Sequence, residues 1–168
     1  GLLPQAATAA PASDVTFTLL HHNDFHGQLE PSGSNPGLAR LADAVNVVRT
    51  AVGADNVLVM DVGDEMQGSL LSNIWQGEPV IDAYNTIGYD AATFGNHEFD
   101  WGQTVLQERV NQAADTTGTY PEDYPYLSAN IVKQDTLGGC TGWDKPDFVS
   151  APYTVITSGG VKFAFIGV

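Results

Sequence analysis

Apolar residues follow two different patterns along this chain, and each pattern predicts one kind of secondary structure. Short β-branched and apolar runs, such as VTFTLL and VLVM, are typical of buried strands. Apolar residues spaced three and four positions apart are typical of helices with one buried face. We expect strands at residues 15–20, 57–60, 91–94 and 127–132, and a hairpin formed by residues 153–157 and 161–168. We expect helices at residues 38–51, 67–75, 79–87 and 104–114.

The order of these elements predicts an α/β fold, because strands that alternate with helices pack as layers. Residues 1–14 stand apart from this pattern. They include the small, uncharged stretch QAATAAPAS, so we expect a flexible N-terminal segment there and one folded unit over residues 15–168. Such a stretch is typical of the mature start of an exported protein, although residues left from cloning would have the same composition.

Composition narrows the classes of function. The 168 residues are 43% hydrophobic, which suits one domain or a large part of one. Twenty acidic residues against six basic ones give a net charge of −14, so we expect no nucleic-acid duplex as a partner. Anionic small substrates stay possible, because a bound metal ion reverses the negative electrostatic field of the acidic residues around it. No apolar run approaches the roughly 18–20 residues that a membrane span needs.

The one cysteine, Cys140, lies in a glycine-rich loop and cannot form a disulfide within the chain. We interpret it as a lone loop cysteine, with a partner beyond residue 168 as the alternative. We do not assign it a role as a nucleophile.

Three polar clusters each follow a predicted buried strand. The first carries Asp24 and His26, the second Asp64 after a glycine, and the third Asn96 and His97. Open α/β sheets gather their functional groups at the carboxyl ends of strands. Each cluster alone is weak evidence, but the three together in equivalent places indicate one site.

The residue types in these clusters are metal ligands. Asp24 and His26 point the same way in an extended segment, so they could bind one cation together. The Asp64 carboxylate could bridge two cations, because its charge screens their repulsion. Asn96 offers a neutral oxygen ligand, and ions such as Zn²⁺ and Mn²⁺ accept this mixture of donors.

His97 suits a different role, because neighbouring side chains diverge and it cannot easily share the metal of Asn96. Asp100 follows it by three residues and could accept a hydrogen bond from its ring if the segment forms one turn. That contact would fix the tautomer and favour the imidazolium, which stabilises a phosphoryl oxygen or a leaving alkoxide.

Two further histidines precede the first cluster. We interpret His21 as an exposed or otherwise satisfied histidine. His22 is two and four residues before Asp24 and His26, so in an extended segment its side chain points to the same side. It could then reach the site from behind the ligands, but we favour a place outside the site.

Several strings of this chain resemble the 5'-nucleotidase family of the calcineurin-like metallophosphoesterases. They are LLHHNDFHGQLEP, VMDVGDEMQGSLLSNIWQGEPVIDAYNTIGYDAATFGNHEFDWG, YLSANI and GGVKFAFIGV. The resemblance runs from about residue 15 to residue 168. It implies a four-layer α/β/β/α metallophosphatase-type domain, of which this chain would carry only the N-terminal part. It also implies a separate C-terminal substrate domain, which is absent from these residues.

The resemblance also implies roles for the site residues. The ligands would be Asp24 and His26 on the first metal, Asp64 bridging both metals, and Asn96 on the second metal. Two divalent ions, Zn, Mn or similar, would lie about 3.5–4 Å apart and hold a hydroxide that attacks phosphorus in line. His97 and Asp100 would form the dyad that stabilises the transferred phosphoryl group.

The chain departs from the family in what it lacks. The family completes its metal sites with later histidines, in a Gly-His pair and a Gly-His-x-His segment, whereas the last of the four histidines here is His97. His22 also stands where the family often has threonine. Remaining ligands and the substrate-binding residues are therefore expected beyond residue 168.

The function predicted from the sequence is two-metal-dependent hydrolysis of phosphomonoesters, with nucleoside 5'-monophosphates as the favoured substrates. One alternative is a related enzyme that acts on cyclic nucleotides, nucleotide sugars or sulfur esters. Another is an inactive structural fragment of such an enzyme. We expect a secreted, periplasmic or cell-surface protein. We also expect it to associate with its missing C-terminal part or to form a homodimer, because an unpaired final strand leaves an exposed edge.

Overall fold

A parallel sheet forms the centre of the computed structural model, which describes residues 14–114, 123–133 and 145–168. Its spatial order is β1-β2-β3-β4. The strands are β1 (Thr18–His22), β2 (Val57–Asp61), β3 (Ala91–Thr93) and β4 (Tyr126–Leu127). The antiparallel hairpin of β5 (Tyr153–Ser158) and β6 (Val161–Ile166) forms a second, separate sheet.

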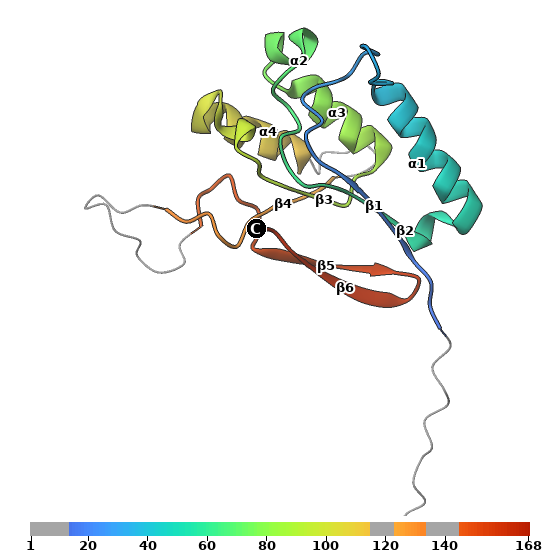
Figure 1. Cartoon of the computed structure of the whole chain (residues 1–168). Coiled ribbons are helices and arrows are strands. Elements are labelled where there is room, and N and C mark those ends of the chain that lie inside the picture. The colour runs from blue at the N-terminus through green and yellow to red at the C-terminus, as the bar shows by residue number, and fades with distance from the viewer. Residues whose placement is uncertain (1–13, 115–122, 134–144) are drawn as a thin grey trace, which may run out of the picture.

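Helices cover one face of the parallel sheet, and the hairpin lies on the opposite face (Figure 1). The helices are α1 (Leu38–Val52), α2 (Leu70–Ile74), α3 (Glu78–Ile87) and α4 (Gly102–Ala113), with short 3₁₀ turns η1 (Ala54–Asn56) and η2 (His97–Phe99). Right-handed crossovers between strands that are neighbours in both sequence and space place successive helices on the same face. The described elements thus form α, β and β layers (Figure 1), and the predicted α/β fold is confirmed.

The strand β2 is buried on both faces, which explains its continuous apolar sequence. Val57 and Val59 belong to the core beneath the helices. Met60 packs instead with Ile156 and Phe165 of the hairpin. The strand therefore contributes side chains to both hydrophobic clusters. This packing holds the carboxyl end of the strand, where the second polar cluster begins.

Two valines of α1 allow a direct test of which face of this helix is buried. Val45 is 2% exposed and Val47 is 61% exposed. Val45→Ala is expected to lower the free energy of unfolding by about 2 kcal/mol, because two buried methyl groups are lost and a small cavity remains. Val47→Ala, its matched control, is expected to stay within about 0.5 kcal/mol. Equal effects of the two substitutions in urea denaturation would contradict this packing.

The first strand begins later than the sequence predicts. Residues 15–17 lie outside it, and it continues through His21 and His22, which pair in parallel register with Met60 and Asp61. A histidine is tolerated at the end of this strand because its ring has hydrogen-bonding and aromatic neighbours in the core. The expected strand at 15–20 was thus correct in kind, with both of its ends displaced toward the C-terminus.

The strand expected at residues 127–132 was wrong over most of its length, since β4 is only Tyr126–Leu127. The Ser128 hydroxyl accepts a hydrogen bond from the Ile131 amide at 3.1 Å, which bends the chain. The Ser128 amide donates to Ala151 O at 3.0 Å, beside the isolated parallel bridge between Leu127 and Ala151. Side-chain competition for the backbone therefore ends this strand early.

The helix expected at residues 67–75 is shorter than predicted and is limited to α2. Ser69 is its N-cap, and the Ser69 hydroxyl accepts a hydrogen bond from the Ser72 amide. Gln67 lies before this helix, and its carbonyl accepts a hydrogen bond from the His26 ring. None of the helices in the described ranges is long and apolar enough to cross a membrane. Residues 1–13 and Cys140 lie outside the described residues.

Candidate metal centre

The loops after β1 and β2 lie side by side at the carboxyl end of the sheet. The Asp24 amide donates to Gly63 O at 2.9 Å, and the His26 amide donates to Asp64 O at 2.9 Å. These bonds extend the pairing of the two strands past their ends. The first two polar clusters of the sequence are therefore brought together by the backbone itself.

Three of the predicted site residues form a compact cluster. His26, Asp64 and His97 each offer one potential ligand atom, and these atoms all lie within 4.8 Å of one another. The His26 and His97 rings meet edge-on with centroids 5.1 Å apart. His97 thus lies among the candidate ligands themselves, closer to the metal-binding atoms than the sequence argument placed it.

The other predicted residues lie next to this cluster. Asp24 Oδ1 is 3.6 Å from His26 Nε2. Asn96 precedes η2 and is exposed, immediately before His97. Asp100 Oδ2 is 2.7 Å from His97 Nδ1. All six side chains named from the sequence therefore belong to one end of the sheet or to the turn beside it.

The His26 ring has the orientation that a metal ligand needs. Its Nδ1 lies 2.8 Å from Gln67 O, and a carbonyl can only accept, so Nδ1 carries the proton. In the neutral ring Nε2 is then free to bind a cation, and it is the nitrogen that faces Asp24. A carbonyl behind the ring is a common device for fixing the tautomer of a ligating histidine.

The backbone of this site is held in an unusual conformation. Asp24, His26 and Asp64 have φ angles of 53°, 51° and 58°, a region that side chains with a Cβ seldom occupy. Such conformations persist where the surroundings determine them, and they concentrate at functional sites. Here the hydrogen bonds between the two loops supply that constraint.

Sequence reasoning missed Glu98, which ties the second and third clusters together. Its carboxylate accepts hydrogen bonds from the amides of Asp64 at 2.9 Å, Glu65 at 2.9 Å and Gly95 at 2.6 Å. Burial raises the pKa of Glu98, although these amides act in the opposite direction. The signal was its place directly after Asn96 and His97, where an acidic residue can turn back toward the preceding loop.

Asp64 is crowded and oriented by the third cluster. Its Oδ1 accepts a hydrogen bond from the His97 amide at 2.8 Å. A Cβ on Gly95 would collide with this same oxygen, so only glycine fits there. One carboxylate oxygen is therefore fixed by the third cluster, while the side chain also contributes to the candidate metal cluster.

Two more carboxyl groups lie buried beneath the site. Asp61 and Glu65 are 1% and 0% exposed. Burial raises the pKa of Asp61 to about 7 and raises that of Glu65 well above its usual range. Within the described residues neither oxygen of Glu65 has a hydrogen-bond partner. A cation bound above them would favour the ionised forms, so this end of the sheet suits positive ligands.

The dyad predicted at His97 is present as a contact. The short distance to Asp100 is that of a charge-assisted hydrogen bond, and this bond raises the pKa of His97.

His22 is placed differently, with its Nε2 2.6 Å from the Tyr89 hydroxyl and its Nδ1 3.4 Å from Asp61 Oδ2. Burial lowers the pKa of His22 to about 4, so its contact with Asp61 is one between a neutral ring and a carboxyl group.

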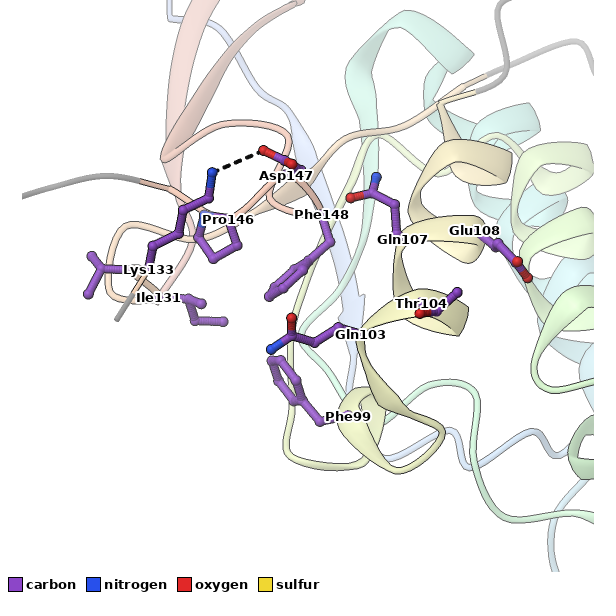
Figure 2. A pocket seen from close by; sticks show the side chains of 11 residues that line it. Phe99, Gln103, Thr104, Gln107, Glu108, Ile131, Lys133, Pro146, Asp147 and Phe148 are labelled. Atoms are coloured by element: carbon purple, nitrogen blue, oxygen red, sulfur yellow. Dashed lines mark hydrogen bonds and ion pairs between the residues drawn. The ribbon is translucent and has the colours of Figure 1, made fainter. Parts of the chain in front are cut away.

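A separate pocket of about 860 Å³ lies against η2 and α4, and none of the cluster residues lines it. Figure 2 shows Phe99, Phe148 and Gln103 around this space, with Lys133 paired to Asp147 at its edge. The candidate metal centre is instead an open arrangement at the ends of the strands.

Comparison with known proteins finds 5'-nucleotidases and related phosphoesterases, although no family model matches the chain. It is 32% identical over 162 residues to a 5'-nucleotidase of Bos taurus, covering 90% of this chain and 26% of that protein. It is 30% identical over 173 residues to the snake venom 5'-nucleotidase of Gloydius brevicauda, covering 96% of this chain and 27% of that protein.

The fold gives the same result. The crystal structure of a 5'-nucleotidase precursor from Thermus thermophilus matches with a TM-score of 0.66 at 30% identity, covering 89% of this chain and 28% of that chain. The chain thus spans about a quarter of the length of these three proteins. These matches identify it as an N-terminal metallophosphatase domain of the 5'-nucleotidase family.

Proposed function

We propose that this chain contributes Asp24, His26, Asp64 and Asn96 to a two-metal centre for hydrolysis of phosphomonoesters, with nucleoside 5'-monophosphates as the favoured substrates. The single observation that carries the proposal is the cluster of His26, Asp64 and His97, whose potential ligand atoms lie within 4.8 Å of one another. The names of the relatives, 5'-nucleotidases from several sources, support the choice of substrate.

The donor set fits divalent cations. Asp24 and His26 would hold one ion, Asp64 would lie between the two ions, and Asn96 would hold the second. Carboxylate, imidazole and amide donors suit Zn²⁺, Mn²⁺ and similar ions. Bound divalent ions supply Lewis-acid stabilisation of a phosphoryl oxygen and lower the pKa of water.

His97 would act on the phosphoryl group through the nitrogen that does not contact Asp100. Because Asp100 accepts from Nδ1, the Nε2 proton of the imidazolium is directed away from this partner. Donation from Nε2 to a phosphoryl oxygen or to the leaving alkoxide would stabilise charge where it develops. Asp100 then serves to fix the ring and keep it protonated.

Asp100→Asn tests this division of roles. The variant is expected to lower kcat for AMP by about 10- to 100-fold, because an amide orients the ring but stabilises its charge poorly. Mn²⁺ affinity is expected to stay unchanged, since Asp100 is not among the proposed ligands. Unchanged kcat in the variant would contradict the role of the dyad.

The unsubstituted protein is expected to hydrolyse AMP faster than cyclic AMP.

We also propose that the protein acts outside the cytoplasm, as secreted, periplasmic or cell-surface proteins do. The name of the snake venom relative supports this location. Association with a further substrate domain or with a second copy stays a prediction. Fractionation of the producing cells, with AMP hydrolysis measured in each fraction, tests the location.

A further inference from the structure

Asp61 is a buried carboxyl group that the proposed reaction does not use. It ends β2, and its side chain is 0% exposed. One oxygen, Oδ1, accepts a hydrogen bond from the Gly63 amide at 2.7 Å. The other, Oδ2, accepts one from the Tyr84 hydroxyl at 2.8 Å. Burying a carboxyl group is costly, so its position calls for an explanation other than packing.

Gly63 connects this carboxyl group to the proposed metal ligands. While Asp61 accepts from the Gly63 amide, the Gly63 carbonyl accepts from the Asp24 amide at 2.9 Å. Gly63 itself has a φ of 105°, and a Cβ there would lie 2.5 Å from Gly95 N. Asp64 follows directly, with a φ of 58°. One residue, Gly63, is thus hydrogen-bonded through both its amide and its carbonyl, and it leads the chain into Asp64 while it holds the backbone of Asp24.

Aromatic side chains hold Asp61 from behind. The Tyr84 and Tyr89 rings stack with centroids 3.9 Å apart and an interplanar angle of 6°. The His22 ring meets each of them edge-on, at 5.8 and 5.7 Å. His22 also contacts the Tyr89 hydroxyl through Nε2 and lies 3.4 Å from Asp61 through Nδ1. The carboxyl group therefore has little freedom to move.

We propose that Asp61 is a positioning residue for the metal ligands Asp24 and Asp64, and that Tyr84, Tyr89 and His22 hold it in place. The inference rests on the proposed metal centre. It assigns no contact with substrate to any of these four residues. A purely structural role would cost stability without changing metal affinity, which gives the test its readout.

The test measures Mn²⁺ binding by calorimetry and AMP turnover on the same preparations. Asp61→Ala is expected to weaken Mn²⁺ binding at least 10-fold and to lower kcat. Asp61→Asn keeps an oxygen for the Gly63 amide, so it is expected to recover most of the affinity. Val110→Ala serves as the control, because Val110 is buried in α4 and its truncation is expected to lower stability without removing any of these hydrogen bonds.

Tyr84→Phe decides the question if Asp61→Ala does not fold, because only a hydroxyl is removed. About threefold or greater weakening of Mn²⁺ binding in this variant supports the proposal, and unchanged binding overturns it. Equal weakening in Val110→Ala and Asp61→Ala, at equal loss of Tm, also overturns it. Mn²⁺ binding without AMP hydrolysis in the unsubstituted protein contradicts the proposed function alone, since the positioning role is still read from affinity.

Discussion

Asp64→Asn is expected to lower kcat/KM for AMP by at least about 10³-fold, which corresponds to about 4 kcal/mol of transition-state stabilisation. Asp64 takes part in three features of the site. Its side chain belongs to the candidate metal cluster, its Oδ1 accepts from the His97 amide, and its amide donates to Glu98. The amide of asparagine keeps the size and one acceptor oxygen but loses the charge that would hold the two proposed cations.

The fold is expected to tolerate this substitution, because asparagine matches aspartate in shape where Gly95 leaves no space for a larger side chain. Asp43→Asn, an exposed change on α1, is the matched control and is expected to leave turnover unchanged. Metal content and turnover should be measured together. Retention of two metals and of full turnover in Asp64→Asn would contradict the proposed role of this carboxylate.

Glu98→Ala is expected to have the largest effect on folding, lowering the free energy of unfolding by about 3–6 kcal/mol and removing activity. Three backbone amides, those of Asp64, Glu65 and Gly95, lose their acceptor. An unsatisfied buried donor costs about 1–3 kcal/mol, and the cavity adds to this. The raised pKa of Glu98 offsets part of the loss, because the buried carboxylate is itself costly near neutral pH.

Glu108→Ala makes the same chemical change on the surface of α4, where its side chain is 59% exposed and 3.6 Å from Arg109. It is expected to change stability by less than about 1 kcal/mol. Urea denaturation of both variants gives the comparison. A Glu98→Ala protein as stable as Glu108→Ala would show that the three amides find water or other partners easily, and that the fold does not depend on this carboxylate.

The sequence was most informative where one physical signal acted alone. The continuous apolar run of β2 predicted a buried strand, and the spacing of apolar residues in α1 predicted a helix that begins at Leu38 and ends before Gly53. The hairpin of β5 and β6 followed from the glycine pair between two apolar runs. In each case local preference and tertiary packing agreed.

The sequence was less informative where side chains compete for the backbone. Ser128 ended β4 through a hydrogen bond that a pattern of apolar residues does not reveal. His22 extended β1 because Tyr89 and Asp61, distant in sequence, satisfy its ring. These contacts exist only once the core has formed, so no local rule could have predicted them.

The candidate site shows the same division. Its polar clusters were found because each follows a strand, and the sheet brings them together as expected. Glu98 and Asp61 were not found, because their roles are hydrogen bonds to backbone amides of other loops. The predicted metal ligands and the roles of His97 and Asp100 stay predictions.

Anomalous scattering from crystals of the protein grown with Mn²⁺ tests the central claim most directly. The account predicts two peaks about 3.5–4 Å apart at the ends of β1, β2 and β3. One should contact Asp24 and His26, the other Asn96, and both Asp64. Peaks elsewhere, or none with Mn²⁺ present at millimolar concentration, would contradict a two-metal centre in this domain.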